Sequence, residues 1–296
     1  MTSVTANPIV SAPPEGGPIV NAMTVDVEDY FHAQALGVDR THWERQPRRV
    51  ERNTHRILDL LEAAGVHGTF FTLAWVAERH RGLIRRIVAA GHELASHGCE
   101  HRRADCQTRD ALRQDLARSR QILEEVGGVA VRGYRAPTFS IGAANPWAFD
   151  VLAEAGYAYS SSIYPVRHDT YGMPEAPRFA FRTAAGIDEY PLTTVRLWGR
   201  NLPCAGGGFF RLLPYAVSRA GLARVNVRDR QPAIFYVHPW EIDPGQPRLP
   251  VPHWKARFRH YVNLGRTEGR LRRLLADHAW DRLDRVFPPA GRDPLT

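Results

Sequence analysis

Segments that read as buried strands alternate along most of the chain with segments whose apolar residues recur at helical spacing. The strand-like runs are residues 19–27, 68–73, 92–96, 131–135, 157–163 and 233–237. The helical segments are residues 50–64, 76–90, 108–126 and 146–155. This alternation favours an α/β fold with a parallel sheet or barrel, because parallel strands need long crossover connections. Right-handed crossovers then gather the carboxyl ends of the strands on one rim.

Three parts of the chain depart from this pattern, one at each end and one in the middle. The first 18 residues are rich in Pro, Ser, Thr and Gly and lack periodicity, so we expect a flexible arm there. Residues 164–208 carry many Pro and Gly residues and predict long loops along one wall of a cleft. Residues 253–264 and 267–275 are amphipathic and predict helices. The expected division is an N-terminal arm over residues 1–18, a barrel over residues 19–245, and a C-terminal helical extension over residues 246–296 packed on the barrel.

The composition narrows the classes of function. The 296 residues are 44% hydrophobic and 24% charged, which is typical of a globular protein. The formal net charge of +8 is scattered along the chain, so we interpret it as a solvated basic surface and expect no nucleic-acid partner. Three cysteines, an odd number, give no disulfide framework. No apolar stretch approaches the roughly 20 residues that span a bilayer, and no secretory signal is visible. We therefore expect a cytoplasmic protein, with peripheral association at the inner membrane left open.

Two histidines four positions apart follow the third predicted strand. His97 and His101 are two imidazoles that together can bind one divalent cation. They need a carboxylate, and residues 26–29, Asp-Val-Glu-Asp at the end of the first strand, are the obvious source. With 13 histidines in the chain, such pairs arise by chance, so the pair gains weight only from its place at a strand end. Cys99 would point away from a face that both histidines share, and we leave it out of the metal site.

The expected rim collects further polar residues at strand ends. The full set is Asp26, Glu28, Asp29, His97, His101, Arg135 and His238. A metal that acidifies water, a free carboxylate as base and a separate histidine as acid are the parts of a metal-assisted hydrolase. Each residue taken alone has a structural interpretation, such as a helix cap or a core histidine bonded to a carbonyl. Their joint placement at strand ends predicts an enzyme.

In this order the motifs resemble those of the polysaccharide deacetylases with a NodB-like domain, carbohydrate esterase family 4. The motifs span residues 24–240 and are Asp26 with Glu28 and Asp29, then Ser96 to His101, then Arg-Ala-Pro-Thr-Phe at 135–139, then Val237 and His238. The segment Asp-Val-Glu-Asp-Tyr-Phe, the segment Tyr-Ser-Ser-Ser-Ile-Tyr-Pro and the tail over 261–275 resemble the subgroup found beside exosortase and exopolysaccharide genes. The resemblance implies a distorted (β/α) barrel of about seven strands. It also implies removal of N-acetyl, or O-acetyl, groups from an acetylated polysaccharide or oligosaccharide.

The resemblance further implies a metal site. His97 and His101 would bind Zn²⁺ or another divalent ion, with a third ligand from Glu28 or Asp29. The family usually has adjacent aspartates at this point, whereas here a valine separates the first aspartate from the next acid. Alternation along a strand favours Glu28, and a chain that has already turned would favour Asp29.

The same resemblance implies an acid and a base. Asp26 would be the general base that deprotonates the attacking water, and Arg135 would keep it ionised by charge pairing. His238 would protonate the leaving amine. Ser160 stands where related sequences commonly have an aspartate. If an acidic residue is needed to raise the pKa of His238, Asp169 is our substitute.

Aromatic residues near the rim give an indication of the substrate-binding surface. Phe139, Tyr164 and Trp240, together with Pro137 of the third motif, are the expected substrate contacts, and Tyr30 and Trp198 are further candidates for stacking on sugars. A backbone N–H near Phe139 would help to stabilise an oxyanion. The glycines at 206–208 indicate a loop whose backbone approaches another group closely.

Two other interpretations compete with the deacetylase. Residues 97–101 also satisfy the His-x-x-Glu-His pattern of inverted zinc peptidases, with Glu100 as base. That mechanism needs the pattern inside a helix, and Gly98 after a predicted strand disfavours this. The second alternative is a catalytically weak barrel that binds an acidic glycan or a membrane surface through its basic C-terminal helices.

Overall fold

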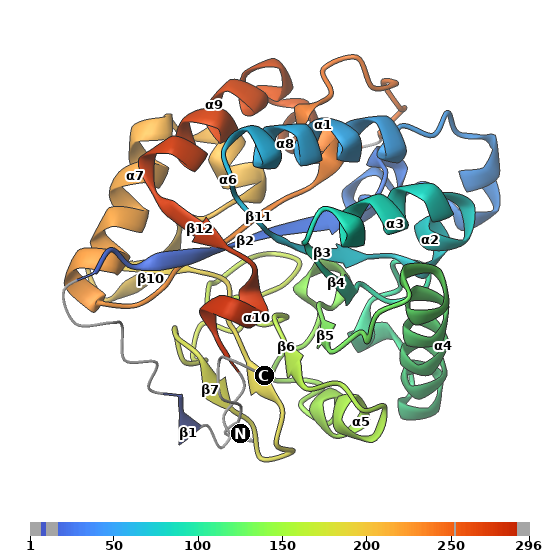
Figure 1. Ribbon diagram of the computed structural model, residues 1–296, viewed down its shortest axis with the longest axis horizontal. Coiled ribbons are helices and arrows are strands. Elements are labelled where there is room, and N and C mark those ends of the chain that lie inside the picture. Colours follow the sequence, from blue (N-terminus) through green and yellow to red (C-terminus); the bar gives the residue numbers. More distant parts are fainter. Residues whose placement is uncertain (1–6, 10–16, 252, 289–296) are drawn as a thin grey trace.

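Seven parallel strands form the centre of the molecule. The computed structural model describes residues 7–9, 17–251 and 253–288 (Figure 1). Within them the parallel strands, in spatial order, are β8 (Asp188–Glu189), β6 (Tyr159–Ser160), β5 (Gly133–Tyr134), β4 (Glu93–Ser96), β3 (Thr69–Thr72), β2 (Val20–Val27) and β11 (Ile234–Val237). The predicted parallel α/β fold of about seven strands is confirmed. The strands are shorter than predicted because the chain leaves the sheet soon after each buried run.

The register of these strands brings the predicted rim residues to one edge. Asp26 is aligned with Phe71 of β3, which is aligned in turn with Ala95 of β4. The backbone N–H of His97 donates to the carbonyl of Thr72 at 3.0 Å, so the pairing continues just past the strands. Residues that follow β2, β4, β5 and β11 therefore leave the sheet side by side.

The sheet is irregular where β8 and β11 would meet. A single parallel bridge joins Gly206 to Tyr236 of β11 in this region. Gly206 has a φ of 129°, and a Cβ built on it would lie 2.2 Å from the carbonyl oxygen of Tyr236. Only glycine therefore fits here, as the close approach expected for residues 206–208 requires. Among the described residues no pairing joins β8 to β11, so the seven parallel strands form an incomplete, distorted barrel.

Helices of the first half cover the outside of the sheet. They are α1 (Val50–Ala63), α2 (Ala74–Arg79), α3 (Arg81–Ala89), α4 (Arg109–Gly127) and α5 (Ala148–Glu154), and Figure 1 shows them around the half of the sheet that contains β3 to β6. Their apolar faces pack on buried strand residues such as Phe70 and Leu94. The single helix predicted over 76–90 is wrong. His80, with a φ of −130°, interrupts it and separates α2 from α3.

The second half adds helices and short strands around the other side. These are β7 (Phe181–Arg182), β9 (Thr194–Leu197), β10 (Arg200–Pro203), α6 (Gly207–Leu212), α7 (Tyr215–Arg224), α8 (Trp254–Tyr261), α9 (Leu264–Asp277), β12 (Ala279–Asp281) and α10 (Leu283–Val286). Short 3₁₀ turns occur at η1 (Tyr30–His32), η2 (Gln34–Leu36), η3 (Arg40–Arg45), η4 (Ala104–Cys106), η5 (Pro137–Phe139) and η7 (Pro239–Ile242), and a π turn at η6 (Val225–Asp229). β12 runs parallel to β2 and ties the C-terminal extension to the central sheet. The division into arm, barrel and extension stays a prediction.

Part of the segment expected to be a flexible arm lies against the sheet. Asn7–Pro8 form strand β1, which pairs antiparallel with β7, and the N–H of Ile9 donates to the carbonyl of Ala180 at 3.0 Å. Local composition could not reveal this pairing because its partner lies about 170 residues away in the chain. Residues 1–6 and 10–16 of the predicted arm lie outside the described residues.

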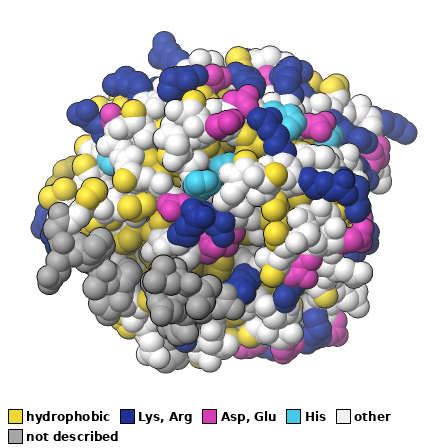
Figure 2. Space-filling view, viewed as in Figure 1, with side chains coloured by type: hydrophobic (Ala, Val, Ile, Leu, Met, Phe, Trp, Pro, Cys, Tyr) yellow, Lys and Arg dark blue, Asp and Glu magenta, His cyan; other side chains and the backbone are white. Residues whose placement is uncertain are grey.

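The surface agrees with the interpretation of scattered charge. Figure 2 shows Lys and Arg side chains spread over one face and interspersed with Asp and Glu, without a single basic patch. Across the described residues, none of the helices combines the length and apolar character that crossing a bilayer requires.

Candidate active site

Glu28, His97 and His101 form a cluster that can hold a metal ion. One ligand atom from each side chain lies within 4.8 Å of the other two. Oε2 of Glu28 is 2.8 Å from Nε2 of His101. Glu28 follows β2 and His97 follows β4, so the parallel register of the sheet creates this meeting point. The four-residue spacing of the histidines is bridged by a loop in which Gly98 and His101 have φ angles of 80° and 51°.

The chemical state of the cluster suits a divalent cation. Nδ1 of His97 lies 2.8 Å from the carbonyl of Arg135, which orients the ring, and burial lowers the pKa of His97 to about 4. This imidazole is therefore neutral at pH 7 and can bind a metal. Burial works against ionisation of Glu28, but the neighbouring His101 and His238 outweigh it and hold the pKa of Glu28 well below its usual range.

A buried polar atom without a partner supports the same interpretation. Oε2 of Glu28 is buried and lies 2.8 Å from Nε2 of His101, yet among the described residues no group donates to it with the geometry of a hydrogen bond. Such an atom is costly unless something else satisfies it. Two imidazoles and a carboxylate are the usual ligands of a catalytic zinc site, so these residues fit Zn²⁺ or a similar ion.

The thiol of Cys99 does not belong to this cluster. Its Sγ lies 3.3 Å from the backbone oxygen of Asp115, and its backbone N–H faces the Asp115 carboxylate. The expectation that Cys99 points away from the two histidines agrees with this geometry.

Asp29, the alternative acidic ligand, has a structural position instead. Its Oδ1 accepts the N–H of Tyr30 at 2.9 Å and caps η1. Its Oδ2 accepts the backbone N–H groups of Arg49 and Val50 at 2.6 and 2.9 Å, where α1 begins. Of the two alternatives, Glu28 rather than Asp29 faces the two histidines, because the chain turns after Glu28 and aims the next side chain at a helix terminus.

Asp26 and Arg135 form a buried ion pair next to the cluster of Glu28, His97 and His101. Nη1 of Arg135 is 2.7 Å from Oδ1 of Asp26 and 2.7 Å from the hydroxyl of Thr24. The other nitrogens bond Ser161, through its carbonyl at 3.0 Å and its hydroxyl at 2.9 Å. The guanidinium also lies 4.1 Å from the centre of the Phe71 ring. All three nitrogens of the Arg135 fork thus donate hydrogen bonds, four in total, which fixes Asp26 in place.

His238 completes the set on the opposite side of Asp26. Its Nε2 lies 3.8 Å from Oδ2 of Asp26 and 3.7 Å from Oε1 of Glu28. Its Nδ1 lies 2.5 Å from Oε1 of Glu241. Burial lowers the pKa of His238, but Glu28, Glu241 and Asp26 outweigh burial and raise it to about 9.

Glu241 is the partner of His238 that sequence reasoning missed. It lies three residues after His238, and its carboxylate also accepts the backbone N–H of His238 at 3.0 Å in a capping box at the start of η7. Asp169, our predicted substitute, instead pairs with Arg259 at 3.0 Å and with His168 at 2.9 Å on the exposed wall. That prediction is wrong. The spacing of a histidine and a glutamate three apart was the signal that would have found Glu241.

Ser160 lies in the sheet and does not contact His238. Its hydroxyl donates to the hydroxyl of Ser162 at 2.8 Å, in the wall behind Arg135. The serine therefore leaves no gap beside His238, because Glu241 from a different segment fills that position.

A cavity of about 990 Å³ opens onto these residues. Phe139 and Trp240 line it as predicted, but Pro137 and Tyr164 do not. Tyr164 is buried beneath Tyr171, and their rings are stacked at 5.8 Å. Tyr30 is buried in the core and Trp198 lies on the β9–β10 turn outside the cavity. The aromatic lining residues that sequence reasoning missed are Tyr171, Phe209, Tyr236, Trp254 and Phe258.

The backbone N–H of Phe139 itself already has a partner. The N–H of Phe139 already donates to the carbonyl of Ala136 at 3.0 Å inside the tight turn η5. Thr138 and Phe139 both have positive φ angles, 57° and 50°, so the turn is held in an uncommon conformation. An oxyanion contact from another backbone N–H near Phe139 stays a prediction.

Comparison with known proteins agrees with this geometry. Residues 38–160 match a family model described as polysaccharide deacetylase, and residues 161–288 match one described as a domain of unknown function, DUF3473. A chitooligosaccharide deacetylase of Sinorhizobium fredii is 36% identical over 112 residues, which cover 38% of this chain and 49% of that protein. The chain thus spans about half the length of this curated relative.

Two solved structures share the fold. A putative polysaccharide deacetylase from Mycobacterium smegmatis superposes with a TM-score of 0.55 at 23% identity, covering 91% of this chain and 88% of that chain. The Puue allantoinase superposes with a TM-score of 0.57 at 15% identity, covering 93% and 90%. At these identities the likeness concerns the fold alone.

Proposed function

We propose that this protein, whose residues 38–160 match the polysaccharide deacetylase family model, is a metal-dependent hydrolase that removes N-acetyl groups from an acetylated polysaccharide or oligosaccharide. The observation that carries the proposal is the meeting of three elements in one cavity. These are the Glu28, His97 and His101 cluster, the Asp26 carboxylate and the His238 imidazole. The name of the Sinorhizobium relative supports an N-acetylated sugar as the target.

The chain's own residues supply the proton transfers. A divalent ion held by Glu28, His97 and His101 would lower the pKa of a water molecule and polarise the acetyl carbonyl. Asp26, fixed by Arg135, accepts a proton from the attacking water. The oxygen of that water adds to the acetyl carbon, and the bond between this carbon and the sugar nitrogen then breaks. His238 donates a proton to the departing nitrogen, so the products are acetate and a free amine.

The lining of the cavity supports a chain of sugars rather than a single small molecule. Trp254 and Phe258 are 71% and 51% exposed, lie four residues apart on α8 and line the cavity. Phe139 and Tyr171 lie on the opposite loops. Exposed aromatic rings can stack on the apolar faces of sugars. An O-acetylated glycan is a second substrate class that the same residues would hydrolyse, with an alcohol leaving in place of an amine.

The natural polymer remains a prediction from sequence. The resemblance to sequences found beside exosortase and exopolysaccharide genes favours an exopolysaccharide. The weak glycan-binding barrel is the alternative that an absence of turnover would support.

The inverted zinc peptidase has little support from the geometry. Residues 97–101 follow β4 in an irregular loop, whereas the peptidase pattern needs a helix. The Glu100 carboxylate pairs with Arg40 and does not line the cavity.

Acetate release tests the proposal directly. Purified protein would be incubated with a panel of N-acetylated and O-acetylated oligosaccharides, before and after removal of metal by a chelator and again after addition of Zn²⁺. We expect release that is lost on chelation and restored by the metal. Full activity of metal-free protein, or no release from any acetylated sugar, would overturn the proposal.

A further inference from the structure

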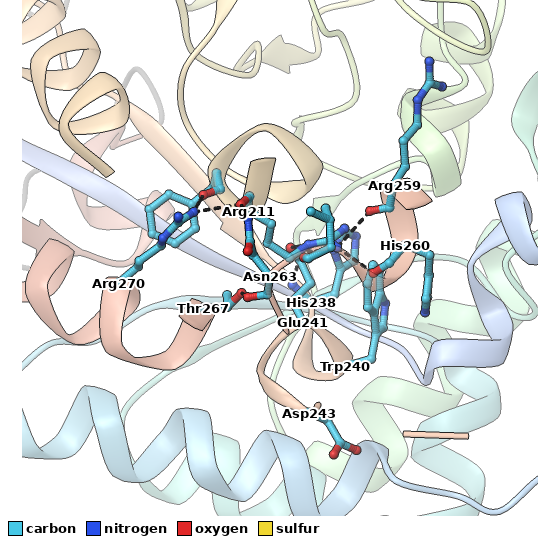
Figure 3. Close-up of polar contacts among 12 residues, drawn as sticks. Arg211, His238, Trp240, Glu241, Asp243, Arg259, His260, Asn263, Thr267 and Arg270 are labelled. Atoms are coloured by element: carbon cyan, nitrogen blue, oxygen red, sulfur yellow. Dashed lines mark hydrogen bonds and ion pairs between the residues drawn. The ribbon is translucent and has the colours of Figure 1, made fainter. Parts of the chain in front are cut away.

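We propose that Arg211 is a positioning residue for the acid side of the active site. Its guanidinium holds the Glu241 carboxylate behind His238 and joins both to the C-terminal end of α8 (Figure 3). The inference rests on the proposed deacetylase function, which it extends. It also gives the segment that matches the domain of unknown function a specific role, the delivery of a proton to the leaving group.

The contacts of Arg211 reach two different parts of the chain. Nε is 2.6 Å from Oε2 of Glu241, and both side chains are buried. Nη1 donates to the backbone oxygens of Arg259 and His260 at 2.9 and 2.6 Å. These carbonyls lie in the last turn of α8, where a helix leaves its carbonyls without partners and carries partial negative charge. One guanidinium thus connects the partner of the acid with the end of the helix that lines the cavity.

Glu241 is held from both sides. Its Oε2 accepts a hydrogen bond from Nε of Arg211, and its Oε1 faces both the ring and the backbone N–H of His238. A carboxylate bonded through both oxygens cannot rotate freely, so its position fixes the rotation of the imidazole. Nε2 of His238 then points toward Asp26 and Glu28, where the leaving group would lie.

Aromatic stacking also connects His238 with the C-terminal end of α8. The ring of Trp240 lies between His238 and His260, with centroid distances of 5.1 and 4.2 Å and interplanar angles of 20° and 14°. The Arg211 guanidinium lies 5.0 Å from the centre of the Trp240 ring. The polar link and the stack therefore run between the same two ends, the acid and the last turn of α8.

The backbone of Arg211 is itself fixed by α9 and the residue before it. The side-chain amide of Asn263 donates to the carbonyl of Arg211 at 2.8 Å. Nη1 of Arg270 donates to the same carbonyl at 2.8 Å and to the carbonyls of Phe210 and Leu213 at 2.7 and 3.0 Å. Arg270 thus holds the C-terminal end of α6, on which Arg211 lies.

Stability alone accounts poorly for this arrangement. Burying two charges has a large desolvation cost, and a buried ion pair is often no more stabilising than apolar residues of the same size. An arginine with a planar guanidinium is suited to hold a carboxylate in one orientation.

The residues of the site come from two matched segments. His97, His101 and Arg135 lie in the segment that matches the deacetylase model, whereas Arg211, His238 and Glu241 lie in the segment of unknown function.

Substrates with different leaving groups distinguish a role of Arg211 in proton donation from a purely structural role. Hydrolysis of an N-acetyl amide needs a proton donated to nitrogen, whereas 4-nitrophenyl acetate releases a stable phenolate without one. Arg211→Met and Glu241→Gln should each lower kcat for an N-acetylated oligosaccharide by about 10²-fold, the usual worth of a general acid. Turnover of 4-nitrophenyl acetate should change by no more than about threefold, and the content of bound Zn²⁺ should not change.

Three controls make the outcome decisive. Arg178→Met removes a partly buried arginine that pairs with Asp229 at 2.9 Å outside the cavity lining, so it should lower the melting temperature but keep the ratio of amide to ester turnover. The Arg211→Met/Glu241→Gln double variant should have about the same amide activity as the less active of the two single variants. The reason is that both residues act on His238 through one carboxylate. If Arg211→Met does not fold, Arg211→Lys, which keeps the charge but lacks the planar fork, is judged by the same ratio.

The result that would overturn the inference is an equal fall in amide and ester turnover in a folded, Zn²⁺-loaded variant. An amide activity unchanged by Arg211→Met would overturn it as well. Failure of the proposed function looks different, because the wild-type protein would then release no acetate or would release it without metal.

Discussion

The indole N–H of Trp240 donates a hydrogen bond of 3.0 Å to Oε1 of Glu28. Trp240 comes from the turn after β11 and Glu28 from the end of β2, so two neighbouring strands cooperate to orient one carboxylate. Trp240 was predicted as a sugar-stacking residue, and it does line the cavity, but only 5% of its surface is exposed. Its indole nitrogen therefore orients Glu28 within the cluster of Glu28, His97 and His101.

This contact leads to a first prediction. Trp240→Phe keeps the aromatic ring but removes the donor, so Glu28 loses the bond that fixes its direction. We expect metal affinity to fall about 10- to 100-fold, as is typical when a residue that orients a ligand is lost. Titration of the metal-free protein with Zn²⁺ measures the effect. An unchanged affinity would mean that Glu28 is oriented by other contacts or does not bind the metal.

The neighbouring acids Glu28 and Asp29 give a second, paired prediction. Glu28→Gln should abolish stoichiometric Zn²⁺ binding, because a neutral amide is a poor ligand for the ion. Asp29→Asn should keep the metal but lower the free energy of unfolding by about 1–3 kcal/mol, since the amide nitrogen would face backbone N–H groups that now have a carboxylate. Metal analysis and urea unfolding of both variants check this. The reverse pattern would make Asp29 the ligand.

A third prediction concerns the choice between deacetylase and peptidase. Asp26→Asn should reduce acetate release by at least about 10²-fold, because the base is lost while the Arg135 contact can still form. Glu100→Gln should leave the rate within about twofold, since Glu100 lies outside the cavity. Comparable losses in the two variants would favour the His-x-x-Glu-His interpretation.

The aromatic wall of α8 gives a fourth prediction. The double variant Trp254→Ala/Phe258→Ala should raise KM for a long N-acetylated oligosaccharide by about 5- to 150-fold, from about 0.5–1.5 kcal/mol for each lost aromatic contact. The kcat for a small acetylated substrate should not change. Trp198→Ala is the control, because Trp198 is 92% exposed but lies outside the cavity. A KM that stays constant for long substrates would exclude α8 from substrate binding.

The acid stability of the protein gives a fifth prediction. Burial would raise the pKa of Glu241, but Arg211 and His238 outweigh burial and lower it to about 2. A carboxyl group with a folded pKa below its unfolded value stabilises the fold above pH of about 4.5 and loses this contribution as pH falls toward 2. The contribution is up to about 3 kcal/mol, from 1.36 kcal/mol per pKa unit.

Urea unfolding of the metal-free protein at several pH values between 6 and 2.5 measures this contribution. Wild-type protein should lose more stability over this interval than Glu241→Gln, which has no carboxyl group to titrate. Parallel curves for the two proteins would show that the ion pair with Arg211 does not stabilise the folded state.

The sequence by itself determined the fold class and most of the site. Apolar runs alternating with amphipathic segments require a parallel sheet with crossover helices, and residues at the carboxyl ends of such strands must meet at one edge. His97, His101, Arg135, Asp26 and His238 were found in this way. The information is local, because hydrophobic period and strand ends are properties of short segments.

Only the tertiary structure decided the finer assignments. Whether Glu28 or Asp29 faces the metal cluster depends on backbone N–H groups at the start of α1, about 20 residues further on, which bind Asp29. Glu241 replaces Asp169 because a turn after β11 places it beneath His238. Tyr164 is covered by Tyr171, and α8, from the far end of the chain, supplies the exposed aromatic rings. The direction and burial of a side chain at a strand end are set by contacts with distant segments, and no local pattern carries that information.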